Sequence, residues 1–265
     1  MPSRDREQAA ALARFYDLDL SVDPGDADLY RALAERTGGP IVELCAGSGR
    51  LALPLAEAGF DITLVDIDPA MLERAAARIA AAAAAVAARM TIVEGDLFRA
   101  DIPGGGTYRL AMVGLNSILI LGGPRRRRRL FEVLASLLAP GGVAIVDAWM
   151  PLAEDLNSFD GRLSLDWVRR DPATGNDVTK LSAAWYDSAT RTVALTSIFD
   201  EGRPGEAPRR RIREDSLHLV AADELRTHAE DAGLEVEMIA GAYDMSPLQP
   251  NDERAIVVAR RPGGP

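Results

Sequence analysis

The sequence has one cysteine, two histidines and one lysine among its 265 residues. Cys45 alone cannot form an intramolecular disulfide, and so few thiols and imidazoles exclude zinc sites built from several of them. We therefore expect no bound metal. The most continuous apolar run, residues 79–88, is almost entirely alanine and too short to span a bilayer. Because no apolar signal core follows the first residues either, the sequence favours a cytoplasmic protein.

Positive charge is also scarce, since 30 basic residues face 40 acidic ones and leave a formal net charge of −10. Nucleic acids and anionic membranes bind positively charged surfaces, so we expect neither as a partner. One basic run, Arg125–Arg129, interrupts this pattern. Nothing basic surrounds it, and a helical sequence follows, so we interpret the run as the solvated start of a helix.

Short apolar runs alternate with helical patterns in the first 150 residues, which is typical of strand–helix units. The predicted strands are 41–44, 61–65, 90–93, 108–115 and 143–146. The predicted helices are 27–36, 50–58, an alanine-rich 70–89 and one that follows the arginine run. The strands are almost continuously apolar, which indicates a parallel sheet covered on both faces.

The pattern changes after residue 150. Alternating segments at 180–186, 191–199 and 209–217 predict antiparallel strands. A helix at 221–232 and strands at 234–241 and 255–260 then complete the first domain. We predict an α/β, Rossmann-like, doubly wound and mostly parallel seven-stranded sheet with an antiparallel β insertion after the fifth strand. The domains would be 1–150 with 218–265, and an inserted roof over the substrate at 151–217.

The first strand–loop–helix unit carries the most information about function. Small residues at 45–49 let the backbone approach a ligand, and the following helix offers free N–H groups. Asp66 ends the second strand, where a doubly wound sheet binds ribose hydroxyls. The same residues satisfy a dinucleotide fingerprint of the form GxGxxA. This unit alone therefore does not identify the cofactor. The alternative is a glycine turn without a binding function, followed by an acidic strand end.

Three further features separate these interpretations. Glu43 lies in the first strand just before the loop, Asp96 closes the third strand, and two strands end the domain. Together with VELCAGSGRLALPLAEAGFDITLVDIDPAML, VEGDLF, LNSILIL and LAPGGVAIVDAW, they resemble the class I S-adenosylmethionine-dependent methyltransferases. The resemblance covers about residues 15–260. It is closest to the bacterial small-molecule branch with an inserted antiparallel sheet, similar to glycine and aminosugar N-methyltransferases.

The resemblance implies S-adenosylmethionine as the cofactor and assigns residues to each of its parts. The methionine end would take Tyr16, Glu43, Cys45, Ala46 and Gly47, the ribose Asp66, the adenine Ile67, Met71, Asp96 and Leu97, and the sulfonium Leu115 and Asn116. The family usually has glycine where Cys45 stands. Because a cysteine is small, we expect a tighter pocket, with a packed side chain rather than a nucleophile.

Methyl transfer from a sulfonium mainly requires an aligned nucleophile and the exclusion of water. An amine must arrive neutral, whereas a hydroxyl would profit from a base. The catalytic candidates are His218, Asn116 and Tyr16. The substrate-binding candidates are Trp149, Met150, Tyr186 and His218, with Asp147 and Asp244 for orienting an amine. His228, among charged neighbours, is interpreted as part of a solvated helix face.

The sequence thus favours methyl transfer from S-adenosylmethionine to a small-molecule acceptor in specialised metabolism, at nitrogen, with oxygen or carbon left open. The alternatives are a cyclase that binds the same cofactor without methyl transfer, a nicotinamide-dependent oxidoreductase, and a non-catalytic ligand-binding regulatory domain. Because inserted sheets pair subunits in related enzymes, we also expect a homodimer. A shared fold does not identify the acceptor.

Overall fold

The computed structural model describes residues 3–263 of the chain. These residues form two compact units. The smaller unit comprises the chain through Val22 together with Pro151–Leu219, and the larger one comprises Asp23–Met150 and the chain from Val220 onward. Each unit is described by itself.

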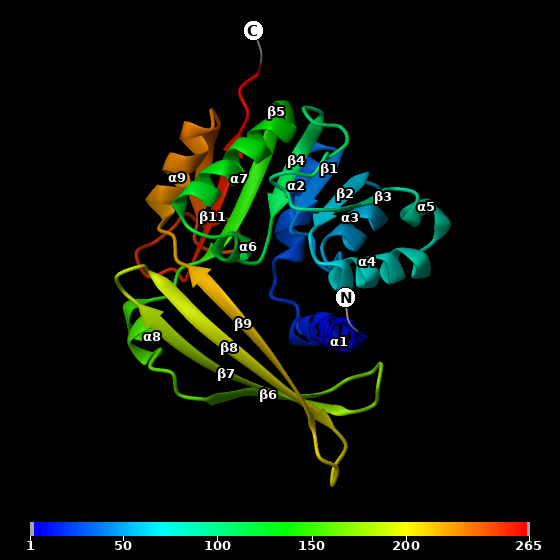
Figure 1. The fold of residues 1–265 in the computed structure, drawn as a ribbon. Coiled ribbons are helices and arrows are strands. Elements are labelled where there is room, and N and C mark those ends of the chain that lie inside the picture. Colours follow the sequence, from blue (N-terminus) through cyan, green and yellow to red (C-terminus); the bar gives the residue numbers. More distant parts are fainter. Residues whose placement is uncertain (1–2, 264–265) are drawn as a thin grey trace. The chain divides into compact units, whose positions relative to one another are not determined.

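The larger unit contains a seven-stranded sheet in the order β10-β11-β5-β4-β1-β2-β3 (Figure 1). Its strands are β1 (Ile41–Leu44), β2 (Ile62–Asp66), β3 (Met90–Glu94), β4 (Tyr108–Val113), β5 (Leu138–Trp149), β10 (Glu235–Ala240) and β11 (Arg254–Arg260). All neighbouring strands are parallel except the pairs that β11 forms with β5 and β10. The parallel strands therefore end at one edge of the sheet, where folds of this kind bind ligands.

Helices cover both faces of this sheet (Figure 1). They are α2 (Ala27–Thr37), α3 (Ala52–Glu57), α4 (Pro69–Ala81), α5 (Ala84–Ala87), α6 (Ser117–Ile120), α7 (Pro124–Leu137) and α9 (Ala222–Asp231). Residues of α2, α3 and α4 share one core cluster with Ile41, Leu64 and Met112 of the strands. Helices α7 and α9 pack on one another and on the sheet. Successive strand residues point to opposite faces, and both Ile41 and Val42 are fully buried. The predicted fold class is confirmed.

The alanine-rich segment differs from its prediction as a single helix over 70–89. Helix α4 ends at Ala81, and the short helix α5 begins only at Ala84. Alanine favours a helix equally at every position, so the composition contains no stop signal. Twenty helical residues would extend about 30 Å, whereas a strand of average length extends about 17–20 Å. The chain must therefore turn early for Met90 to pair with Ile62.

The smaller unit contains a four-stranded antiparallel sheet in the order β6-β7-β8-β9. Its elements are α1 (Ser3–Asp19), α8 (Ala153–Ser158), β6 (Ser164–Arg170), β7 (Asp177–Asp187), β8 (Thr192–Gly202) and β9 (Arg209–His218). The predicted insertion after the fifth strand is confirmed, but α8 and β6 were not predicted. The register of β6 shifts between Leu165 and Trp167. This irregularity interrupts the alternation by which an edge strand is recognised.

Helix α1 packs on this sheet through an apolar core. The rings of Phe15 and Phe199 stack with their centroids 5.0 Å apart, and Leu18 and Val178 are buried in the same cluster. The residues come from distant parts of the chain. The core of the smaller unit therefore exists only when α1 lies on β7 and β8.

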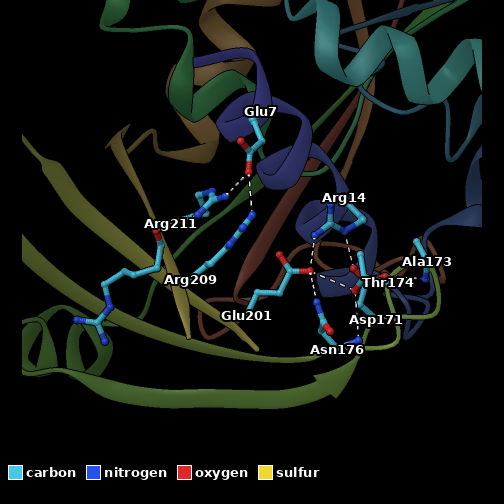
Figure 2. Close-up of polar contacts among 10 residues, drawn as sticks. Glu7, Arg14, Asp171, Ala173, Thr174, Asn176, Glu201, Arg209 and Arg211 are labelled. Carbon is cyan, nitrogen blue, oxygen red and sulfur yellow. Dashed lines mark hydrogen bonds and ion pairs between the residues drawn. The ribbon is translucent and has the colours of Figure 1, made fainter. Parts of the chain in front are cut away.

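An ion-pair network fixes the same helix to the sheet (Figure 2). The Arg14 guanidinium contacts the Asp171 carboxylate, and its Nη2 lies 2.7 Å from Oε1 of Glu201. The Thr174 hydroxyl and the Asn176 amide also donate to Oε1 of Glu201, over 3.1 and 3.3 Å. Asp171 is 1% exposed and Glu201 8%. Buried carboxylates are stable only with such partners.

The carboxyl end of α1 is fixed in the same way. Asp19 accepts hydrogen bonds from Nε1 of Trp167 over 2.7 Å and from Nζ of Lys180 over 2.6 Å. The Arg169 guanidinium donates to the carbonyl oxygens of Leu18 and Asp19. These last carbonyls of a helix have no partner within the helix, so the arginine satisfies them.

The compact units differ from the predicted domain division at the start of the chain. The division grouped residues 1–150 with 218–265, whereas the chain through Val22 clusters with the inserted strands. The amphipathic sequence of α1 predicts that the helix packs on an apolar surface. It does not indicate which surface, because the residues that α1 contacts lie more than a hundred positions away in the sequence. Residues 1, 2, 264 and 265 of that prediction lie outside the described residues. The assignment of a separate function to each domain stays a prediction.

Candidate active site

The loop after β1 approaches β2 closely. Gly47 has φ +56°, and a Cβ atom placed on it would lie 2.9 Å from Cε of Met71. Any other residue there would need a left-handed backbone and would displace the methionine. Cys45 also has a positive φ, +57°, without being glycine. Its burial raises the pKa of the thiol, so the neutral form dominates and the side chain lacks the character of a nucleophile.

Asp66, at the end of β2, holds this loop in place. Its Oδ2 accepts a hydrogen bond from the backbone N–H of Gly47 over 2.7 Å, and its Oδ1 accepts one from Asp68 over 2.9 Å. Burial raises the pKa of the Asp66 carboxyl, while these two N–H groups act in the opposite direction. Each carboxylate oxygen has a further lone pair and can accept another hydrogen bond from a ligand.

A pocket of about 270 Å³ lies beside this carboxylate, at the ends of β2 and β3. It is lined by Cys45, Val65, Asp66, Ile67, Gly95, Asp96, Leu97, Phe98, Ile120, Leu121 and Arg126. Five of them are predicted cofactor residues, namely Cys45, Asp66, Ile67, Asp96 and Leu97. The other six were not predicted as cofactor residues, namely Val65, Gly95, Phe98, Ile120, Leu121 and Arg126. The segment LNSILIL, which supports the family resemblance, contains two of these.

Asp96 presents one of its oxygens to this pocket region. Its Oδ1 accepts the backbone N–H of Phe98 over 3.0 Å. Its Oδ2 lies 3.9 Å from Nη2 of Arg126, which is too long for a hydrogen bond. The Asp96 carboxylate therefore keeps acceptor capacity for a ligand that carries an N–H donor.

Glu43 lies inside β1 beneath the loop and is 5% exposed. Its Oε2 is buried and has no hydrogen-bond partner among the described residues. Burial raises the pKa of its carboxyl to about 8, although the charge of Arg50 acts to lower it. A buried polar atom without a partner is rare in proteins. A bound positively charged group would stabilise the ionised form of this carboxylate.

Comparison with known proteins connects this geometry with a family. Residues 41–142, from β1 into β5, match the model of a methyltransferase domain. The seven-stranded sheet and the pocket at its strand ends have the arrangement expected of the S-adenosylmethionine-dependent class. The larger unit carries a methyltransferase domain with the class I fold. S-adenosylmethionine is the methyl donor of this enzyme family, and structures similar to this chain include one with the donor bound.

Curated relatives of this chain are uncharacterized proteins of Mycobacterium tuberculosis and Mycobacterium bovis. They are 33% identical to this chain over 116 residues, which is 44% of the chain and 39% of the relatives. The chain thus matches about two fifths of the length of these relatives.

Three solved structures share the fold over almost the whole chain. The CcbJ methyltransferase from Streptomyces caelestis has a TM-score of 0.76 at 21% identity, covering 91% of both chains. The sugar N-methyltransferase KedS8 from Streptoalloteichus has a TM-score of 0.71 at 22% identity, covering 93% of this chain and 92% of its own. CalS10 from Micromonospora echinaspora, an amino pentose methyltransferase solved with S-adenosylmethionine bound, has a TM-score of 0.65 at 20% identity, covering 89% and 88%.

The ends of β4 and β5 in the methyltransferase domain meet through Asn116. Its Oδ1 accepts the backbone N–H of Trp149 over 2.6 Å, and Met150 donates its N–H to the Glu253 carbonyl. Asn116 and the preceding Leu115 have positive φ values of +66° and +44°. Neither residue lines the 270 Å³ pocket. The amide of Asn116 therefore joins two strand ends, and its contact with a sulfonium stays a prediction.

Asp147, a candidate for orienting an amine, is fully buried beside these strand ends. It accepts a hydrogen bond from the Tyr243 hydroxyl over 3.0 Å and contacts the Arg254 guanidinium. Burial raises the pKa of the Asp147 carboxyl, and Arg254 opposes this shift. The side chain is thus engaged within the protein. Asp244, the other candidate, is exposed and accepts the backbone N–H of Ser246.

The smaller unit holds the remaining predicted site residues. Tyr16 is half-buried on α1, and Tyr186 is half-buried on β7. His218 ends β9, with its Nδ1 3.2 Å from the Thr192 hydroxyl. Trp185 is exposed, so Trp185 and Tyr186 differ in exposure, as expected of neighbouring residues on a strand. The roles of Tyr16, Tyr186 and His218 stay predictions.

The interpretation of His228 as a solvated residue is wrong. Both ring nitrogens are buried without a hydrogen-bond partner among the described residues, and the ring centroid lies 6.4 Å from that of Phe131 on α7. Burial lowers the pKa of this histidine. His228 follows the buried Leu225 by three positions, so both lie on the inner face of α9. Arg226 and Glu230, two positions away on either side, are exposed on other faces of the helix.

The interpretation of the arginine run as wholly solvated is also wrong. Arg127 is 2% exposed, and Arg126 lines the pocket. Arg125 and Arg126 are exposed, and Arg128 and Arg129 form exposed pairs with Asp231 and Glu132, so only Arg127 departs from the expectation. Five consecutive residues point in all directions around a helix, so one of them must face the core.

Within residues 3–263, no helix combines the length and apolarity needed to cross a membrane. No group of three or more histidine, cysteine, aspartate or glutamate side chains in the same residues is arranged to hold a metal ion.

Proposed function

We propose that the chain transfers a methyl group from S-adenosylmethionine to a small-molecule acceptor, at nitrogen. The observation that carries this proposal is the pocket at the ends of β2 and β3. It places the carboxylates of Asp66 and Asp96 next to apolar walls from Ile67 and Leu97. Two carboxylates with spare acceptor capacity suit the hydroxyls of a ribose and the amino group of an adenine, and the apolar walls suit the base.

The residues on either side of the pocket fit the rest of the cofactor. Gly47 keeps the backbone close to Met71, and the unpartnered Oε2 of Glu43 suits the positive amino group of the methionine end. When bound, S-adenosylmethionine supplies an electrophilic methyl group on a sulfonium. The chain would contribute positioning and the exclusion of water, which account for most of the catalysis in a transfer from an activated donor.

Two similar structures support an amino sugar as the acceptor. KedS8 is a sugar N-methyltransferase and CalS10 an amino pentose methyltransferase. A neutral amine needs no strong base, and His218 is our candidate for receiving the proton lost after transfer. Trp149, Met150 and Tyr186 remain the proposed substrate contacts. Location in the cytoplasm, association as a homodimer and use in specialised metabolism are parts of the same proposal.

Replacing Asp66 with alanine is expected to weaken the binding of S-adenosylhomocysteine about tenfold to a hundredfold, the effect of losing hydrogen bonds to a charged group. Isothermal titration calorimetry measures the dissociation constant. Asp68→Ala is the matched control. Asp68 caps α4 through the N–H of Ala70, so its loss should cost about 1 kcal/mol of stability and leave the affinity intact. Equal affinities of Asp66→Ala and the unmodified chain would show that the ribose is held elsewhere.

Incubation with methyl-labelled S-adenosylmethionine and a panel of amino sugars tests the reaction itself. Mass spectrometry should detect an acceptor that gains one methyl group. Binding of S-adenosylhomocysteine without transfer to any acceptor would favour the cyclase or the regulatory domain. Binding of NADH in place of S-adenosylhomocysteine would favour an oxidoreductase.

A further inference from the structure

The arginine run at the start of α7 opposes an ordinary rule of helix stability. The first turn of a helix carries partial positive charge, so acidic residues are stabilising there and basic ones destabilising. Helix α7 has no acidic residue in its first turn, which holds Arg125, Arg126 and Arg127 instead. Departures from local rules without local compensation are typical of functional positions. Arg127 is buried, whereas Arg125 and Arg126 are exposed, and of these two only Arg126 lines the pocket.

Arg126 is placed by three contacts at the wall of the cofactor pocket. Its guanidinium carbon lies 4.9 Å from the centroid of the Phe98 ring, in the range of a cation–π interaction. Its Nη2 lies 3.9 Å from Oδ2 of Asp96. Its Cδ atom lies near Gly122, where an added Cβ would be only 3.1 Å away. The side chain thus bridges from α7 to the loop after β3 across one wall of the pocket.

We infer that Arg126 is a positioning residue that holds the Asp96 carboxylate in the orientation that recognises the amino group of adenine. The inference rests on the proposed function of the pocket. One oxygen of Asp96 is fixed by the N–H of Phe98. The other oxygen, Oδ2, lies 3.9 Å from Nη2 of Arg126, which is beyond hydrogen-bond distance. The positive guanidinium therefore attracts and orients this oxygen and leaves it able to accept a hydrogen bond from the ligand. Stacking on Phe98 fixes the guanidinium in turn.

This arrangement gives the pocket a preference for the base. An amino group donates hydrogen bonds and suits a carboxylate, whereas a carbonyl oxygen at the same position of the ring is repelled by it. An oriented Asp96 therefore discriminates between adenine and hypoxanthine. A carboxylate released from Arg126 can rotate away from the carbonyl, which lowers the cost of binding the wrong base.

The test compares S-adenosylhomocysteine with S-inosylhomocysteine, which carries hypoxanthine, by calorimetry. The unmodified chain should prefer S-adenosylhomocysteine, and Arg126→Met should lower that preference about threefold to fivefold. Arg129→Ala is the matched control, because Arg129 lies on the same helix, pairs with Glu132 and is absent from the pocket lining. It should leave the ratio of the two affinities unchanged. Arg126→Lys keeps the charge without the planar stacking and should fall between the unmodified chain and Arg126→Met.

Other outcomes separate the inference from the proposed function. In an Asp96→Asn background, Arg126→Met should produce no further loss of preference, since the two residues act as a unit. If Arg126→Met weakens the binding of both compounds equally, Arg126 only lines the pocket and does not orient Asp96. This result would overturn the inference but not the proposed function. Failure of the unmodified chain to bind S-adenosylhomocysteine would overturn the proposed function and this inference with it.

Discussion

Replacing Arg14 with methionine is expected to release α1 from the inserted sheet and to lower the stability of the smaller unit by about 3 kcal/mol. The methionine keeps most of the side-chain volume but leaves two carboxylates behind. Asp171 and Glu201 are almost inaccessible to water. Removing the partner of a buried charge costs far more than removing a surface ion pair, because the remaining charge is neither solvated nor neutralised.

Hydrogen exchange of the α1 amides measures this effect locally, and urea denaturation measures it globally. Arg209→Met is the control, since Arg209 pairs with Glu7 and the two side chains are 74% and 60% exposed. That pair should contribute less than about 1 kcal/mol. Asp171→Asn in the Arg14→Met chain should restore part of the stability, because it removes one of the stranded charges. If Arg14→Met and Arg209→Met exchange at the same rate, the network of Figure 2 does not hold the helix.

Glu43→Gln is expected to stabilise the larger unit at alkaline pH by about 5 kcal/mol relative to the unmodified chain. The pKa of the Glu43 carboxyl is about 8 in the folded chain, compared with an ordinary value of 4.5. The folded state therefore binds more protons than the unfolded state between these two pH values. Stability from this group is complete below pH 4.5 and is lost as the pH rises through 8. Glutamine resembles the protonated carboxyl and cannot ionise.

The free energy of unfolding, measured by urea titration from pH 5 to pH 9, checks this dependence. The unmodified chain should lose at most about 1.4 kcal/mol per pH unit through this one group. The difference between Glu43→Gln and the unmodified chain should therefore grow with pH and level off above the pKa. Glu57→Gln makes the same change on the exposed side of α3 and serves as the control. A constant difference between Glu43→Gln and the unmodified chain at every pH would contradict the assignment.

The sequence contained enough information for the larger sheet, because each parallel strand is apolar on both faces and ends at a turn. It did not contain the end of α4, since nothing distinguishes Ala81 from Ala82 except the need to return to β3. It did not reveal β6, whose register shift hides the alternation. The position of α1 could not be predicted either, because an apolar helix face does not indicate which surface it packs on.

The residues of the pocket at the ends of β2 and β3 were also only partly predictable from the sequence. Asp66 and Asp96 were predictable because strand ends in a parallel sheet meet at one edge. Phe98 and Arg126 were not, since they reach the pocket from a loop and from the first turn of α7. His228 was misjudged because Arg226 and Glu230, its near neighbours in the sequence, are charged and exposed, while Leu225, three positions earlier on the same helical face, is buried and apolar. The local sequence shows which residues are adjacent along the chain, whereas the pocket is formed by residues that are distant in the sequence and close in space.

The attachment of α1 to the inserted strands has a consequence for the order of folding during protein synthesis. Arg14 and Asp171 are 157 positions apart. The ribosome thus releases α1 long before the strands on which it packs, and the entropic cost of closing so long a loop falls on the last steps of assembly. Until β7 and β8 emerge, the apolar side of α1 has no surface to cover and is available to chaperones.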